Sequence, residues 1–341
     1  MTSLAVIPGD GIGPEVIEQA LKTLEALGAG LDIDLLDHVN AERYLADGVG
    51  LSDMDLDRIR SSDGVLLGAV GDARVAHTDY VRSVLLRLRF ELDLYVNHRP
   101  AKLLDDRLSP LRDETKRAVD CVVVRENTEG LYAGVGGVLR PQTPFEVTMD
   151  AEINTHYGVS RIIDYAFSVA RSSVCMIDKS NAVPFGGQLW QRYWREAAAR
   201  HPDIETSHLY MDAAVMKLVE DPTRYDVIVA NNSHGDILSD LTAQLAGGLG
   251  TAASANINPA SNFGLYEPVH GTAPDIAGRG LANPIGAILS AALMLDRFGH
   301  VEWAQAVRRA VATVIERRRV TPDLGGTLCT EDAGAAIRGA L

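Results

Sequence analysis

The sequence predicts an α/β protein with a largely parallel sheet. Short apolar runs of strand length alternate along the chain with helical patterns, which is typical of repeated strand–helix units. The chain has 341 residues, 46% of them hydrophobic, a length that suggests roughly two domains. No low-complexity tract and no fixed-period repeat interrupts this pattern. We therefore expect a folded protein with a sizeable buried core.

Composition argues against several classes of partner. The net charge of −14 disfavours a general nucleic-acid binder, because phosphate backbones are bound by clustered Lys and Arg. The longest apolar stretches are too short to span a bilayer, and a strand begins near the start, at residues 4–7, so we expect neither a membrane protein nor a secretory signal. Cys121, Cys175 and Cys329 lack metal-ligand spacing, which indicates reduced thiols in the cytoplasm.

The first strand leads through a glycine-rich turn into the clearest helix of the chain. Pro14 stands at the predicted helix start, after the turn at residues 8–13, and an apolar stripe follows at Val16, Ile17, Leu21 and Leu24. Such a turn invites a phosphate-binding interpretation, but GDGIGPE lacks the spacing of the dinucleotide fingerprint. Turn glycines usually mean only positive φ angles, so we do not predict a Rossmann loop.

Three arginines stand at the ends of predicted elements in the next part. Arg89 lies on a helix after the apolar run 63–69, Arg99 follows the run 94–97, and Arg125 ends the buried-looking strand that begins at Cys121. Arginines in such places are mostly solvated surface charges. If the three met in space they would suit a polycarboxylate, because the guanidinium fork pairs bidentately with carboxylates.

The segment 227–240 is predicted to form a strand, a turn and the start of a helix. Asp236 and Asp240 are four residues apart on a helix that Gly235 is expected to open, so both carboxylates share one face. They could converge on a hard cation such as Mg²⁺ or Mn²⁺. Taken alone, acids in a first helical turn more often just favour the positive end of the helix dipole.

Other polar residues follow strands in the second half of the chain. Lys179 comes after residues 174–177, Asp212 follows Tyr210, and His270 precedes a helix expected over 284–295. Each of them, taken alone, is more often a surface or core residue than part of a site.

The order of motifs resembles a known family. The chain is similar to the β-decarboxylating dehydrogenases of 3-isopropylmalate, isocitrate, homoisocitrate and D-malate, and the resemblance covers nearly all of it. The motifs that carry it are GDGIGPE, LRFELDLYVNHRP, VVVRENTEGLY, DKSN, YMDA, GDILSD, EPVHGTAPDIAGRGLANP and PDLGG.

The resemblance implies a role for most of the candidate residues. Arg89, Arg99 and Arg125 would clamp the malate carboxylates, with Asn181 also at the substrate. Asp236 and Asp240 would bind Mg²⁺ or Mn²⁺ together with Asp212 of the partner subunit. Tyr132 and Lys179, the latter also from the partner, would transfer protons. The implied protein is therefore a homodimer with shared active sites.

The resemblance also implies a fold and a cofactor. The family has two domains and a large mixed sheet flanked by helices, and it is not a Rossmann fold. Residues 1–97 with 248–341 would bind the nucleotide, and residues 98–247 would carry substrate, metal and dimer contacts. Asp275 would favour NAD, because an acid repels the 2′-phosphate of NADP. The expected cofactor-binding residues are Glu267, His270, Gly271, Thr272, Ala273, Asp275 and Asn283.

The helix before Arg89 is expected to select the C3 substituent of the malate, and its signals conflict. Arg82 and Ser83 favour an anionic side chain, as in isocitrate, homoisocitrate or a phosphonate analogue. Leu85 and Leu86 match the isopropylmalate pattern. Because an unpaired arginine against an isopropyl group would be costly, we expect an anionic side chain, with 3-isopropylmalate as the alternative.

Two other classes of function stay open from the sequence. A non-catalytic regulatory subunit of the same fold is disfavoured because no metal, clamp or proton-transfer residue is missing. A plain ligand-binding protein would need the acids and arginines to be surface features. The chain also departs from the family at Ser233–His234, where an apolar pair is common, and at Ala182, so the finer shape of the pocket is open.

Overall fold

The computed structural model describes residues 2–341 and confirms the α/β class. The strands are β1 (Ser3–Gly9), β2 (Asp32–Leu35), β3 (Gly64–Ala69), β4 (Val96–Lys102), β5 (Asp120–Glu126), β6 (Gly130–Leu139), β7 (Val147–Ile153), β8 (Ser173–Asp178), β9 (Glu205–Tyr210), β10 (Val227–Ala230), β11 (Ala253–Asn258) and β12 (Phe263–Pro268). The α-helices are α1 (Gly13–Ala26), α2 (Ala41–Asp47), α3 (Asp53–Arg60), α4 (Arg87–Glu91), α5 (His156–Val169), α6 (Pro184–Arg200), α7 (Met211–Glu220), α8 (Asn232–Leu245), α9 (Ile285–Arg297), α10 (Val301–Glu316) and α11 (Thr330–Arg338).

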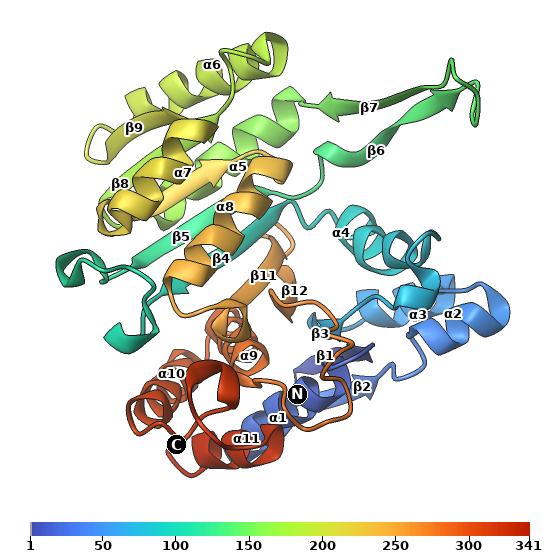
Figure 1. The fold of residues 1–341 in the computed structure, drawn as a ribbon, viewed down its shortest axis with the longest axis vertical. Helices are drawn as coiled ribbons and strands as arrows, with labels where there is room; N and C mark the ends of the chain where they lie inside the picture. Colours follow the sequence, from blue (N-terminus) through green and yellow to red (C-terminus); the bar gives the residue numbers. More distant parts are fainter. Residues whose placement is uncertain (1) are drawn as a thin grey trace.

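A ten-stranded sheet runs through the molecule in the order β2-β1-β3-β12-β11-β4-β5-β10-β8-β9 (Figure 1). The strands on both flanks are parallel, but β12, β11, β4 and β5 pair antiparallel with one another. Only four residues join β11 to β12, too few for a crossover helix, so these two strands form a hairpin. The sheet is therefore mixed, as the family resemblance implied, and less parallel than the apolar runs alone predicted.

Alternate side chains of each strand enter different cores. Leu4 and Val6 of β1 face a core shared with α1, α5, α6, α9 and α10, whereas Ala5 and Ile7 face the opposite side. Ile228 of β10 faces α7 and α8 in a third cluster. This is the period of two that a sheet covered on both faces requires. One face thus has a continuous core, and the other has one core at each end.

The glycine-rich turn after β1 has a structural role. Gly11 has a φ of +57°, and a Cβ there would collide with the carbonyl oxygen of Thr272. The Asp10 carboxylate accepts hydrogen bonds from the Ala41 and Gly71 amides and from the Tyr80 hydroxyl at 2.7–2.8 Å. The turn therefore joins three segments of the chain, and the prediction that it is not a Rossmann loop agrees with this packing.

Two expected helix boundaries are corrected by the structure, whereas the expected domain division stays a prediction. Helix α8 begins at Asn232 and not at Gly235, because the Asn231 side chain accepts the His234 amide at 2.9 Å and caps the helix. The helix before Arg89 is split into a π-helical turn, Arg82–Leu86, and α4. The expected division at residues 97 and 98 falls inside β4, which pairs with β11 on one side and β5 on the other.

Strands β6 and β7 form a separate antiparallel arm that projects from the body (Figure 1). Most of its side chains are exposed, Phe145 at its tip to 71%. In residues 2–341, no helix has both the length and the apolar character needed to cross a membrane.

Candidate active site

The structure brings the three arginines together. Arg89 from α4, Arg99 from β4 and Arg125 from the end of β5 line one cleft of about 280 Å³. Their exposed fractions are only 5%, 8% and 2%, so they are not surface charges. The antiparallel register of β4 and β5 sets Asn97 opposite Arg125, which places Arg99 two residues further along the neighbouring strand. The cleft is also lined by Tyr132, Asp236, Glu267 and His270.

Each of the three clustered arginines lies next to at least one acid at the edge of the cleft. Arg125 pairs with Asp236, Arg99 lies 3.3 Å from the Asp240 carboxylate, and Arg89 lies 3.1 Å from Glu267. Burial lowers the pKa of Arg125 to about 9, with the nearby Arg99 and Arg89 acting in the same direction. The Arg125 guanidinium still stays protonated at neutral pH. The cleft is suited to an anion with several carboxylates.

Two nitrogen atoms of the clamp are left without partners. The Nε atoms of Arg89 and Arg99 are buried and have no hydrogen-bond acceptor within residues 2–341. Buried donors of this kind are costly to leave unpaired. Unpaired buried donors are more typical of a ligand-binding site than of a structural core.

Helix α8 carries the predicted metal ligands. Asp236 and Asp240 lie one turn apart, and Arg99 reaches both, at 3.4 and 3.3 Å. Within the described part of the chain, no three His, Cys, Asp or Glu side chains form a metal-binding group. One chain therefore offers two carboxylates that fit a hard cation, and further ligands must come from substrate, water or a second chain.

Tyr132 stands at the base of the arm, on β6. Its hydroxyl donates to Asp236 at 3.3 Å, and the Arg125 guanidinium lies 5.5 Å from its ring centroid. Burial raises the pKa of Tyr132, and the Asp236 charge raises it further. The phenol is therefore protonated at neutral pH and can act as a proton donor.

Lys179, Asn181 and Asp212 do not line the arginine cleft of their own chain. Lys179 pairs with Asp212, which lies in the first turn of α7. Asn181 is exposed in the turn before α6. Since the family resemblance assigns Lys179 and Asp212 to the site of a partner, their sharing between sites stays a prediction.

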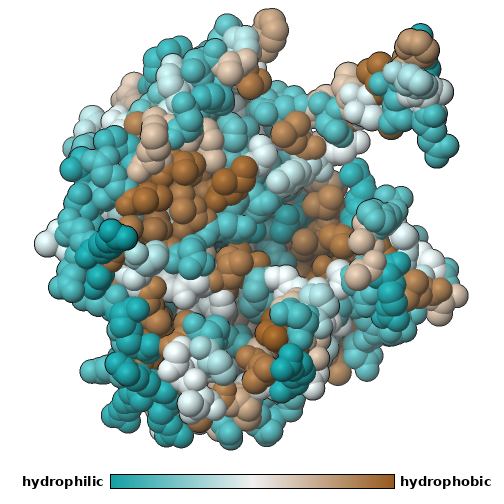
Figure 2. Space-filling model, viewed as in Figure 1, coloured by the Kyte–Doolittle hydropathy of each residue, from teal (hydrophilic) through white to brown (hydrophobic). Residues whose placement is uncertain are grey.

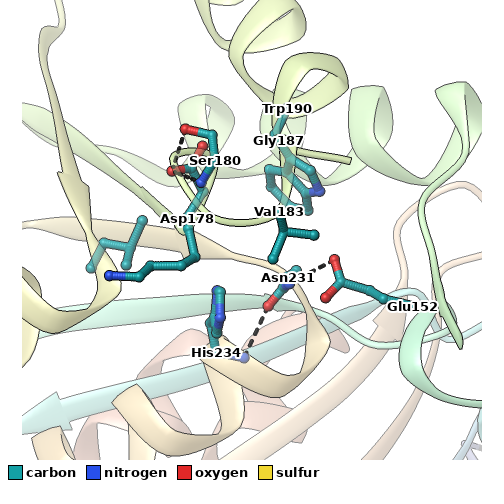
Figure 3. A pocket seen from close by; sticks show the side chains of 10 residues that line it. Glu152, Asp178, Ser180, Val183, Gly187, Trp190, Asn231 and His234 are labelled. Atoms are coloured by element: carbon teal, nitrogen blue, oxygen red, sulfur yellow. Dashed lines mark hydrogen bonds between the residues drawn. The ribbon is translucent and has the colours of Figure 1, made fainter. Parts of the chain in front are cut away.

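A small cavity of about 20 Å³ lies beside Lys179, large enough for about one water molecule (Figure 3). His234, Asn231 and Glu152 converge on it, and Asn231 donates to Glu152 at 3.3 Å. The His234 Nδ1 atom is buried and unpartnered in residues 2–341, and burial lowers the pKa of this imidazole. His234 stands where the family commonly has an apolar residue. It is thus a neutral polar group next to Lys179, the predicted proton-transfer residue.

The helix that should select the C3 substituent presents a leucine to the cleft. Leu85 lines it, whereas Arg82 is exposed and donates to the Ala133 carbonyl at 3.3 Å. The Ser83 hydroxyl donates to the Tyr80 carbonyl at 2.7 Å. Neither Arg82 nor Ser83 is among the residues that line the cleft in this structure.

The predicted cofactor segment leaves the cleft along the surface. His270 and Gly271 line the cleft, and the Thr272 carbonyl accepts the Ile12 amide at 3.0 Å. Ala273 has a left-handed φ of 40°, and the exposed Asp275 carboxylate has no hydrogen-bond partner in residues 2–341. This open acid and the unpartnered His270 Nε2 fit the binding of a nucleotide ribose along the segment.

Two of the predicted cofactor residues are engaged within the protein. Glu267 accepts from the Asn256 amide at 2.7 Å as well as pairing with Arg89. Asn283 is buried and donates to Asp323 at 2.9 Å. Both therefore have structural contacts that the sequence did not suggest.

Two site residues were missed by the sequence analysis. Asn232 accepts from Arg125 at 2.7 and 3.0 Å, and Ser239 accepts from Arg99 at 2.8 Å. Asn232 precedes Asp236 by four residues, and Ser239 follows it by three, so both share its helical face. Helical spacing around Asp236 was the signal that could have found them.

Comparison with known proteins identifies the family. The family model described as isocitrate/isopropylmalate dehydrogenase matches residues 3–337. The chain belongs to the isocitrate/isopropylmalate dehydrogenase family. It is thus an enzyme, a dehydrogenase of a family that uses NAD and a divalent metal ion. Both the expected family and the expected non-Rossmann fold are confirmed.

Relatives and solved structures agree with this assignment. The 3-isopropylmalate dehydrogenase of Leifsonia xyli is 49% identical and that of Thermobifida fusca 45%, over 92% and 98% of this chain and 91% and 96% of theirs. The isocitrate dehydrogenase structure from Methylococcus capsulatus has a TM-score of 0.91 at 38% identity, covering 100% of this chain and 99% of that one. A β-decarboxylating dehydrogenase from Thermococcus kodakarensis has a TM-score of 0.81 at 37% identity, covering 100% and 96%.

Proposed function

We propose that the enzyme oxidises and decarboxylates 3-isopropylmalate to a 2-oxo acid, with NAD and a divalent cation. The main support for this substrate comes from relatives that are 44–49% identical over more than 90% of the chain. Each of them is named 3-isopropylmalate dehydrogenase. Leu85 in the cleft supports it, because an isopropyl group needs an apolar neighbour. The anionic side chain expected from Arg82 becomes the alternative.

The residues of the cleft fit each step of this reaction. Arg89, Arg99 and Arg125 hold the two malate carboxylates and fix the orientation of C2 and C3. Lys179 of the partner subunit takes the C2 hydroxyl proton, and Tyr132 returns a proton to C3 after CO₂ leaves. When bound, NAD would supply the hydride acceptor for C2, and the cation held by Asp236 and Asp240 would supply positive charge that stabilises the charge left by CO₂ loss. One proton leaves the substrate and one returns, so the step balances.

Asp236 and Asp240 would bind Mg²⁺ or Mn²⁺, together with Asp212 of the partner subunit. Asp275 would accept hydrogen bonds from the adenosine ribose, and its charge favours NAD over NADP. His270, Gly271, Thr272 and Ala273 would lie along the nucleotide. Glu267 and Asn283 would support this segment through Arg89 and Asp323.

A homodimer is part of the proposal. Helices α7 and α8, which contact each other, expose Met216 to 65%, Val219 to 48% and Ile237 to 55%. Figure 2 shows a hydrophobic area on this face of the molecule. These side chains flank Asp212 and Asp236 in sequence, so an apolar interface at this patch would bring metal ligands of two chains together. Residues 98–247 would form the dimerising domain, and residues 1–97 with 248–341 the nucleotide domain.

We also place the enzyme in the cytoplasm. All three cysteines are free, with Cys121 and Cys175 buried. Burial raises the pKa of Cys121 to about 12 and that of Cys175 to about 11, so both stay unreactive thiols. Unpaired cysteines are typical of a reducing compartment.

A malate with an anionic side chain is the second candidate. It is favoured by Arg82, which pairs with no carboxylate of residues 2–341, and by the similarity to the isocitrate dehydrogenase of Methylococcus capsulatus. A phosphonate or carboxylate at C3 would need the Arg82 side chain to turn into the cleft.

Comparison of kcat/KM for 3-isopropylmalate, isocitrate and homoisocitrate tests the substrate proposal. We expect 3-isopropylmalate to be preferred by more than about tenfold, since burying an unpaired carboxylate beside Leu85 costs more than about 1.4 kcal/mol. Preference for isocitrate or homoisocitrate would support the alternative. Absence of turnover with all three would contradict both substrate candidates.

A further inference from the structure

Arg82 contacts a part of the molecule that the proposed mechanism does not explain. Its Nη2 atom donates to the Ala133 carbonyl at 3.3 Å, and its guanidinium lies over Gly134. Gly134 has a φ of +72°, and a Cβ there would overlap the guanidinium nitrogens. The guanidinium therefore packs directly on the backbone at Ala133 and Gly134, where no side chain intervenes.

The other side of the arm base is fixed to α8. The Asn232 side chain donates to the Glu129 carbonyl at 2.9 Å, and Gly130 lies against the Asn232 Cβ. In sequence, Tyr132 lies between Gly130, which contacts Asn232, and Ala133, which contacts Arg82. Arg82 belongs to the same helical segment as Leu85 and Arg89, which line the cleft. Arg82 thus connects the substrate-binding helix to the strand that carries the proton donor.

We propose that Arg82 is a positioning residue that fastens the base of the arm to this helix and so holds Tyr132 over the cleft. We call the contact of Arg82 with Ala133 and Gly134 the arm latch. Its catalytic consequence rests on the proposed role of Tyr132, but the contact itself does not depend on the substrate. The latch gives Arg82 a role that needs no anionic side chain on the malate.

A matched control lies on the same helical segment. Arg87 donates to the Leu51 carbonyl at 2.6 Å and pairs with Asp53, so it is fastened to the start of α3 and not to the arm. Arg87→Ala removes the same charge and a similar backbone hydrogen bond. It should leave the arm and Tyr132 in place.

Hydrogen exchange of residues 130–139 in the unliganded enzyme tests the latch directly. Arg82→Ala should accelerate exchange there by roughly three- to tenfold, the effect of losing one net hydrogen bond, and Arg87→Ala should not. Unchanged exchange in Arg82→Ala would overturn the latch. This result is independent of the substrate, so it separates failure of the latch from failure of the proposed function.

Kinetics test the positioning role. Arg82→Ala should lower kcat for 3-isopropylmalate by roughly three- to tenfold with KM within about twofold, because the three clamp arginines remain. Arg82→Lys, which can still donate to the carbonyl, should recover part of kcat. Unchanged kcat in Arg82→Ala would overturn the positioning role. A changed preference between 3-isopropylmalate and isocitrate in Arg82→Ala would also overturn it, because it would assign Arg82 to the substrate.

Discussion

His98 shows how a single residue near the clamp can make stability depend on pH. It precedes Arg99 on β4, and its Nδ1 atom lies 3.2 Å from the Tyr165 hydroxyl. Burial lowers the pKa of His98 to about 4, with the charge of Arg297 acting in the same direction. The folded state therefore holds the neutral imidazole, whereas the unfolded chain binds a proton near pH 6.5.

We predict that stability falls as the pH is lowered from about 6.5 to about 4, the window between the unfolded and folded pKa values of His98. The loss should be below about 3 kcal/mol, because the imidazole is partly exposed. Above this window the contribution is fully present. His98→Gln should flatten the dependence, as measured by urea unfolding at several pH values. An equal slope in wild type and variant would contradict the assignment.

The proposed metal site can also be tested by changing a single residue. Asp240→Asn keeps the size of the side chain but removes an anionic ligand. We expect Mn²⁺ affinity and kcat to fall by on the order of 100-fold or more, since even changes outside the ligand set cost about 10–100-fold. Calorimetric titration with Mn²⁺ and thermal unfolding measure binding and folding separately. Full turnover of the variant in excess chelator would contradict the proposal that Asp240 binds a catalytic metal ion.

Among the elements, α8 has the largest influence on the site. It carries Asp236 and Asp240, and through Asn232 and Ser239 it holds Arg125 and Arg99. Its start is fixed by the Asn231 cap, and the same side chain contacts Glu152 on strand β7 of the arm. The geometry of the cleft therefore depends on where this helix begins.

Asn231→Ala should destabilise the protein by about 1 kcal/mol through loss of the cap, and should also lower kcat/KM because the metal-binding turn loosens. Ser52→Ala is the matched control, since Ser52 caps α3 away from the cleft and should cost a similar amount of stability. Urea unfolding and steady-state kinetics distinguish the two effects. If both variants keep the wild-type kcat/KM, the cap does not position the site.

The elements also show what the sequence could and could not predict. Buried strands such as β10 and the amphipathic α1 follow from apolar spacing, which is a local property. The arm was missed because its strands, of which β6 is rich in glycine, are mostly exposed and bury no periodic face. Strand direction in the centre of the sheet depends on pairing between distant segments. For the same reason, local patterns could suggest that the three arginines converge but could not establish it.

At the scale of the whole molecule, the proposed site needs residues from two chains. Lys179 and Asp212 pair with each other and do not line the arginine cleft of their own chain. The apolar patch on α7 and α8 includes Met216 and Val219, which follow Asp212 closely in sequence. Dimerisation at this patch would supply both residues to the cleft of a second copy, so catalysis would require the dimer.

Mixing Lys179→Ala with Arg99→Ala chains, each inactive alone, should restore activity. After full subunit exchange we expect roughly a quarter of wild-type activity, because half of the dimers are mixed and each mixed dimer has one complete site. Mass spectrometry of the intact dimers verifies the exchange. No recovery after verified exchange would show that the sites are not shared.

The most direct test of the proposed reaction is its stoichiometry. The purified enzyme is incubated with 3-isopropylmalate, Mg²⁺ and either NAD or NADP, and reduced nucleotide, CO₂ and the 2-oxo acid are quantified together. We predict equal amounts of NADH, CO₂ and 2-oxo acid with NAD, strongly reduced turnover with NADP, and none in excess chelator. Reduction of NAD without release of CO₂, or no reduction at all, would contradict oxidative decarboxylation in the arginine cleft.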